Sequence, residues 1–71
     1  MEPYRVRATI NGELREIDDG ATLAGLLEAL KVPAEGTAVA VNDRVVPRAE
    51  HASYRVREDD RIEIIVAVAG G

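Results

Sequence analysis

The residues best suited to chemistry are the last two, Gly70 and Gly71, which follow the apolar run 66–69. The α-carboxylate of Gly71 has an ordinary pKa of about 3.5, so it is ionised at neutral pH and reacts as an electrophile only after activation, for example by adenylation with ATP. A tail that enters another enzyme's ATP site must be narrow beside its carbonyl, and glycine has no Cβ. A chain end without function has the same properties, so these residues alone leave both interpretations open.

Other groups that could support catalysis are scarce. The chain has one histidine, His51, and no cysteine. His51 and Ser53 are two residues apart with no orienting acid implied, so we expect His51 to have a packing or surface role. The acidic runs 18–19 and 58–60 fall where turns are expected, and we interpret them as side chains that bond their own backbone rather than a metal. We predict a protein that is not itself an enzyme, with no catalytic residue, no metal and no bound cofactor.

The composition limits the chain to one small domain. It has 71 residues, no cysteine and a formal net charge of −4, so burial of aliphatic side chains must supply the stability. A negative net charge disfavours binding to nucleic acid and to anionic membranes. No apolar stretch approaches the ~20 residues of a membrane span. We predict a cytoplasmic protein with one domain over residues 1–71, a flexible tail at 69–71 and basic protein partners.

The first half of the chain predicts a hairpin followed by a helix. Polar and apolar residues alternate over 4–10, Asn11-Gly12 suits a tight turn, and 13–17 returns as a second strand. Thr22 is a suitable N-cap for a short helix that ends near Lys31 and Pro33. One stripe of that helix is apolar, comprising Leu23, Leu26, Leu27 and Leu30.

The second half predicts three more strands. They cover 38–42, 45–46 and 61–68, and the last is predicted to be the longest and to lie at the centre of the sheet. The segment 48–57 has little periodicity and predicts a turn or a single helical turn. The order of elements indicates an α+β fold with a mixed sheet of four to five strands packed on one main helix.

Alternation along these strands also predicts a docking face on the side of the sheet away from the helix. The helix-facing set is Val6, Val39, Val41, Ile62, Ile64 and Val66. The opposite face then has an apolar centre made of Ala38, Ala40, Ile65 and Ala67, with charged residues around it, namely Arg5, Arg7, Arg61 and Glu63. An apolar centre with a charged rim is typical of protein interfaces, although isolated apolar residues are also common on ordinary surfaces.

Three segments resemble a known family: DGATLAGLLEAL (19–30), AVAVNDRVVPR (38–48) and DDRIEIIVAVAGG (59–71). Together they resemble the sulfur carrier proteins of thiamine biosynthesis, the ThiS family, over nearly the whole chain. The resemblance implies a ubiquitin-like β-grasp fold and chemistry at Gly70 and Gly71. It implies that an E1-like adenylyltransferase uses ATP to adenylate the Gly71 carboxylate. Sulfur from a donor such as a cysteine desulfurase then displaces AMP, and the thiocarboxylate gives its sulfur to thiazole synthase.

Two departures from the family pattern concern local structure. Asp59 stands where the family commonly has glycine, so we expect a strained or altered turn there. His51 stands where an aromatic residue often follows the Val-Pro-Arg segment, so a packing contact is expected to differ.

Other functions remain open at this point. The small subunit of molybdopterin synthase shares the fold and the Gly-Gly end, but it usually has a Pro-Pro pair where this chain has 65–68. Carriers for cysteine biosynthesis or tRNA thiolation are further alternatives. A different class is a ubiquitin-like interaction module that binds partners through its sheet and has an inert tail.

Overall fold

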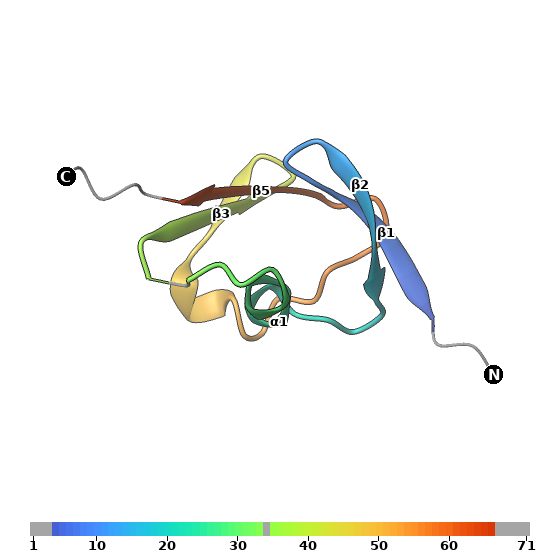
Figure 1. The fold of residues 1–71 in the computed structure, drawn as a ribbon, viewed down its shortest axis with the longest axis horizontal. Helices are drawn as coiled ribbons and strands as arrows, with labels where there is room; N and C mark the ends of the chain where they lie inside the picture. Colours follow the sequence, from blue (N-terminus) through green and yellow to red (C-terminus); the bar gives the residue numbers. More distant parts are fainter. Residues whose placement is uncertain (1–3, 34, 67–71) are drawn as a thin grey trace.

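Five strands and one α-helix form the part of the chain that this computed structural model describes, residues 4–33 and 35–66 (Figure 1). The elements in chain order are β1 (Arg5–Ile10), β2 (Glu13–Asp18), α1 (Leu23–Ala29), β3 (Thr37–Val41), β4 (Arg44–Val46), the 3₁₀ turn η1 (Arg48–Glu50) and β5 (Arg61–Val66). The strand order is β2-β1-β5-β3-β4, with β1 and β5 parallel and the other pairs antiparallel. This arrangement confirms the predicted α+β fold.

The N-terminal hairpin and the helix follow from local sequence signals. Asn11 and Gly12 both have positive φ angles, +50° and +85°, which is the geometry of a tight hairpin turn. The Thr22 hydroxyl accepts a hydrogen bond from the Gly25 N–H at 3.1 Å, which confirms the predicted cap. The helix ends at Ala29, and Lys31 lies beyond it in the left-handed region at φ +59°.

The core lies between α1 and one face of the sheet (Figure 1). Its largest fully buried side chains are Leu23, Val39 and Ile62, one from the helix and two from the central strands. The alternation prediction places Val39, Val41 and Ile62 correctly in the core, whereas Val66, two residues beyond Ile64, is 45% exposed. Val66 pairs with Thr37 at the end of β5.

Strand β5 occupies the centre of the sheet, as the sequence predicts. Its described part, Arg61–Val66, has the same length as β1 and β2, and the predicted extension over 67–68 lies outside the described residues. Asn11 fixes the register beyond the end of β1, because its amide group accepts from the Ile64 N–H at 2.8 Å and donates to the Ile64 carbonyl at 3.3 Å. The central strand is therefore held on both sides where it leads toward the C-terminus.

The turn before β5 is built around a buried carboxylate. Asp60 is 4% exposed, and its two oxygens accept hydrogen bonds from the Arg57 N–H at 2.8 Å, the Tyr54 hydroxyl at 3.1 Å and the Asn42 amide at 3.0 Å. Burial, and then the charge of Asp60 and the hydrogen bond to it, raise the pKa of the Tyr54 hydroxyl. Asp59 has φ +66°, so the expected strain at this position is confirmed.

Glu58 extends the contact between this turn and β1. Its carboxylate accepts from the Arg7 backbone N–H at 2.9 Å and from the Arg7 guanidinium at 3.2 Å. The backbone hydrogen bond is the main cause that lowers the pKa of Glu58. The acidic run 58–60 therefore serves the backbone of the turn and of β1, in line with the interpretation from sequence.

Candidate functional site: the outer sheet face and the tail

The predicted reactive residues, Gly70 and Gly71, and the predicted face residue Ala67 lie outside the described residues. The structure does describe the strand that leads to them. β5 runs parallel to β1 and antiparallel to β3, and its last described residue, Val66, pairs with Thr37 at the start of β3. The last described residue before Gly70 and Gly71 therefore belongs to the central strand of the sheet.

The structure brings Ala38, Ala40 and Ile65 together on the outer face. Ile65 pairs with Ala38, and it is 62% exposed. Ala40 pairs with Glu63 on one side and with Val45 on the other. These pairings give one connected surface on β3, β4 and β5, which we call the outer apolar patch and which comprises Ala38, Ala40, Val45 and Ile65. Its role in docking stays a prediction.

Val45 also belongs to this patch, although the sequence pattern did not predict it. It is 74% exposed, whereas its neighbour Val46 is buried. The two-residue period of a strand places consecutive residues on opposite faces. Alternation of exposed and buried positions along Arg44–Val46 could have indicated that Val45 faces outward. A strand of three residues is too short for this period to be recognised from sequence.

Arg5 and Arg7 lie away from the outer apolar patch. Thr9 is level with Arg61 across β1 and β5. Arg5 is four residues before Thr9 and Ile65 is four residues after Arg61, so Arg5 and Ile65 are separated by about 26 Å along the strands. Arg7 is held by Glu58 instead, and Arg5 contacts two carboxylates of β2 at 3.6 and 3.8 Å.

The charges that do border the patch belong to β5 and the β3–β4 turn. Glu63 is the partner of Ala40, and Arg61 forms an ion pair with Asp43 at 2.9 Å. A further apolar residue, Leu14, lies across Thr9 on the same face and is 68% exposed. The face therefore combines exposed aliphatic side chains with charges of both signs, which is the composition expected of a docking surface.

His51 has the packing role that its sequence context favours. The side chain is 4% exposed, and its Nε2 lies 2.9 Å from the Val46 carbonyl, so Nε2–H donates this hydrogen bond. Ser53 bonds elsewhere, because its hydroxyl donates to the Glu50 carbonyl at 3.2 Å. The structure therefore gives this pair no nucleophile–base contact. Among residues 4–33 and 35–66, no helix has the length and apolar character needed to cross a membrane.

Comparison with known protein families assigns the chain directly. The profile of the ThiS family matches residues 8–71. The chain belongs to the ThiS family. A crystal structure of a ThiS thiamine biosynthesis protein from Geobacter metallireducens superposes with a TM-score of 0.79 and is 30% identical, covering 93% of this chain and all of that one. The fold is therefore the ubiquitin-like β-grasp.

Relatives with described functions are of two kinds. The sulfur carrier protein ThiS of Escherichia coli is 34% identical over 61 residues, which are 86% of this chain and 92% of that protein. A thiazole synthase of Magnetococcus marinus is 39% identical over 62 residues, which are 87% of this chain but 19% of the synthase. A thiazole synthase of Paramagnetospirillum magneticum matches over 20% of its length. The chain thus spans about a fifth of the thiazole synthases it matches.

Proposed function

We propose that this protein is the sulfur carrier of a thiamine biosynthesis pathway and that Gly71 bears the transferred sulfur. The main support is the match to the Escherichia coli sulfur carrier, which covers 92% of that relative. The ThiS family profile also extends through Gly71. In this proposal the protein is a co-substrate of other enzymes, and it acts in the cytoplasm.

The chemistry follows from the properties of a carboxylate. A carboxylate oxygen of Gly71 attacks the α-phosphate of ATP in the active site of an E1-like adenylyltransferase, and pyrophosphate leaves. The acyl adenylate is an electrophile, so the persulfide sulfur of a cysteine desulfurase attacks its carbonyl carbon and expels AMP. A thiol, such as that of free cysteine, then cleaves the S–S bond of the resulting acyl disulfide, which releases the thiocarboxylate and leaves the thiol in a disulfide. This chain supplies the reacting group, and the absence of a Cβ at Gly70 and Gly71 keeps the approach to the carbonyl open.

The two thiazole synthase relatives support thiazole synthase as the sulfur acceptor. Each contains a segment similar to almost all of this chain. A carrier-like segment within the acceptor enzyme is consistent with direct transfer between the two proteins. This observation favours thiazole formation over molybdopterin, cysteine or tRNA thiolation as the destination of the sulfur.

The outer apolar patch, with Ala67, docks on the activating enzyme in this proposal. Removal of Ile65 from water on docking is worth roughly 1.5–3 kcal/mol, as for other large aliphatic side chains. A glutamate there would place an unpaired charge in the interface. Arg5 and Arg7 make no direct contribution at the patch centre, because the register places them at the other end of β1.

The test is ATP–pyrophosphate exchange by the E1-like enzyme with three variants of the carrier. Deletion of Gly71 should abolish exchange while the fold is retained. Ile65→Glu should raise the KM for the carrier at least about tenfold, because roughly 1.4 kcal/mol of binding energy is lost. Ala52→Glu is the matched control, since Ala52 is exposed beside the helix and away from the sheet face. Unchanged exchange after deletion of Gly71 would contradict the carrier function, and an unchanged KM for Ile65→Glu would contradict the docking face alone.

A further inference from the structure

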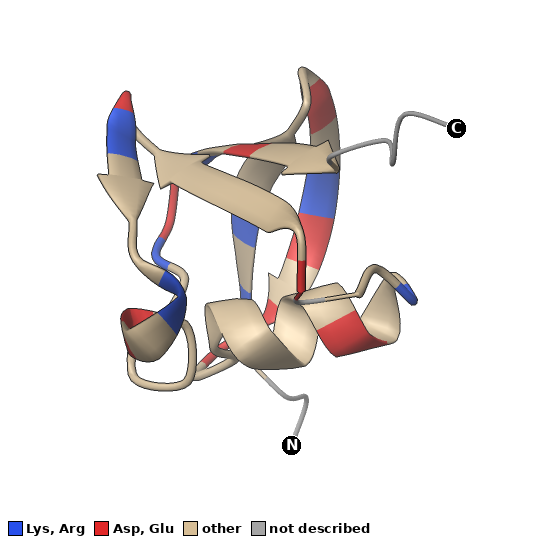
Figure 2. Cartoon of the chain, turned by 90° about the vertical axis from the view of Figure 1, so that its left-hand side faces the viewer, with Lys and Arg blue, Asp and Glu red and all other residues tan. Residues whose placement is uncertain are grey.

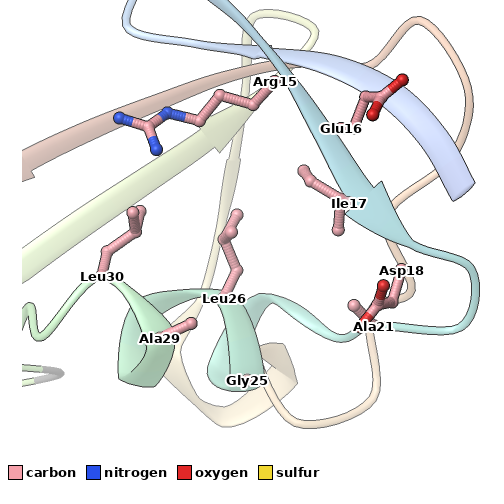
Figure 3. Close-up of a pocket in the computed structure, with 9 residues that line it drawn as sticks. All are labelled: Arg15, Glu16, Ile17, Asp18, Ala21, Gly25, Leu26, Ala29 and Leu30. Carbon is pink, nitrogen blue, oxygen red and sulfur yellow. The ribbon is translucent and has the colours of Figure 1, made fainter.

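A groove lies between β2 and α1, and the proposed sulfur carrier chemistry does not use it. It has a volume of about 440 Å³. Figure 3 shows Leu26 on α1 and Leu30 just after it rising toward β2, from which Ile17 points down and Arg15 extends above Leu30. On the helix side, the groove is lined by Gly25 and Ala29, which occupy little space because glycine has no side chain and alanine has only a methyl group. The floor is therefore apolar and open to an incoming side chain.

Strand β2 is also an edge of the sheet in the described part of the chain. The Asp19 N–H donates to the Tyr4 carbonyl at 2.9 Å across β1 and β2. Hydrogen-bonded pairs recur at every second residue of an antiparallel ladder, so Arg15 and Ile17 also direct their backbone groups toward β1. Leu14 and Glu16 consequently direct their N–H and carbonyl groups toward the free edge. Such an edge can pair with an extended segment of another chain.

The charges beside this edge favour a partner segment of positive charge. Figure 2 shows charged residues of both signs on the strands at this side of the sheet. Glu16 and Asp18 have side chains that are 63% and 81% exposed, and both contact Arg5, at 3.6 and 3.8 Å. Two carboxylates share one guanidinium through long contacts, so a negative charge remains uncompensated on the outer side of the edge. Arg15, on the groove side, contacts Glu13 at 3.8 Å.

We propose that the β2 edge and the β2–α1 groove bind an extended segment of a partner protein in which apolar and basic residues alternate. The segment pairs with the free backbone groups of Leu14 and Glu16. Its apolar side chains enter the groove above Leu26 and Leu30, and its basic side chains lie on the outer face beside Glu16 and Asp18. The two-residue period of a strand satisfies both requirements at once.

This site is separate from the proposed sulfur chemistry. Ile17 pairs with Val6, which is three residues before Thr9, and Thr9 is level with Arg61 of β5. Val66 is five residues beyond Arg61, so Ile17 in the groove lies about 26 Å along the strands from the last described residue of β5. A partner bound in the groove therefore leaves the outer apolar patch and the C-terminal strand accessible. The groove can hold the carrier to a second protein while Gly71 is engaged elsewhere.

The test is an NMR titration of the isotope-labelled protein with a capped heptapeptide in which lysine and valine alternate, beginning and ending with lysine. We expect saturable shifts at the Leu14 and Glu16 amides and at the Leu26 and Leu30 methyl groups. Amide exchange at Leu14 and Glu16 should slow about tenfold when the site is filled. A heptapeptide of the same composition with its four lysines in one block should bind at least about fivefold more weakly.

Variants separate this mode from general attraction to an acidic protein. Ala29→Arg should fill the groove and weaken binding at least about fivefold, whereas Ala52→Arg, its matched control beside the helix, should not. The double variant Glu16→Lys and Asp18→Lys should lose affinity for the lysine–valine peptide and gain affinity for the corresponding glutamate–valine peptide. The ion pairs of Arg5 are exposed, so this variant should remain folded.

Four outcomes of the peptide titration would overturn the proposal. They are equal binding of the block peptide, equal weakening by Ala29→Arg and Ala52→Arg, shifts confined to the outer apolar patch, and no saturable binding. Concentration-dependent shifts at Leu14 and Glu16 without peptide would also overturn it, because they would make a second copy of this chain the occupant.

Discussion

The buried carboxylate of Asp60 offers the sharpest test of how the turn before β5 is held. Replacing it by asparagine keeps the shape but removes the charge and one acceptor oxygen. In the wild type, one oxygen accepts from Asn42 and the other from Tyr54 and Arg57. The asparagine NH₂ must face one of these donor groups. Asn42 cannot turn to accommodate it without a further loss, because its own oxygen accepts from the Arg61 N–H at 2.9 Å.

The expected cost follows from these contacts. Hydrogen bonds to charged groups contribute about 1.5–3 kcal/mol each, and a buried donor left without an acceptor costs about 1–3 kcal/mol. We expect Asp60→Asn to lower the free energy of unfolding by roughly 2–4 kcal/mol in total, since water can reach part of the site at Asn42. The whole domain has 71 residues, and its free energy of unfolding is expected to be roughly 4–10 kcal/mol. The substitution therefore removes a large fraction of the stability.

Urea unfolding followed by circular dichroism measures this effect. With a slope of about 1 kcal/mol per M, the midpoint should fall by roughly 2–4 M with little change in slope. Asp59→Asn is the matched control, because Asp59 is exposed and asparagine tolerates a positive φ. It should change the stability by less than about 0.5 kcal/mol. If Asp60→Asn costs no more than Asp59→Asn, the turn is not held by the Asp60 carboxylate and the reasoning is wrong.

Two further predictions concern the same turn. Asp59→Gly should raise the free energy of unfolding by about 0.5 kcal/mol, because glycine adopts φ +66° without a Cβ clash; a lower urea midpoint would show that the Asp59 side chain stabilises the turn. The pKa of Glu58 is lowered in the folded state, so its contribution is present above the unfolded pKa of the carboxyl and is lost as the pH falls through the folded pKa. With Glu58→Gln, the free energy of unfolding should therefore fall less steeply as the pH is lowered. An unchanged decrease at acid pH would show that another group controls it.

Local signals were sufficient to predict most elements of the fold. Asn11-Gly12 and Thr22 act within a few residues of their positions, and the structure has the turn and the cap that they favour. Strand alternation identified β5 and its buried residue Ile62, because one face of the central strand packs on the helix. The burial of Asp60 was not predicted, because its partners Asn42 and Tyr54 approach only after β3 and the segment before β5 have packed together.

The candidate site was predicted less completely than the fold. Ala38 and Ile65 were correctly placed on one face, since alternation assigns a residue to a face. Alternation does not give the register between strands that are distant in sequence. Arg5 and Arg7 were therefore assigned to the rim of the patch, although the pairing of Thr9 with Arg61 places them at the far end of β1.

The intact mass of the protein shows whether Gly71 carries sulfur. The protein would be incubated with its E1-like enzyme, ATP, a cysteine desulfurase and cysteine, and then measured by mass spectrometry. We expect an increase equal to the mass difference between sulfur and oxygen, located in the C-terminal peptide and lost without ATP. If the mass is unchanged while the Escherichia coli sulfur carrier is thiolated by its own enzymes in a parallel reaction, the sulfur carrier function is contradicted.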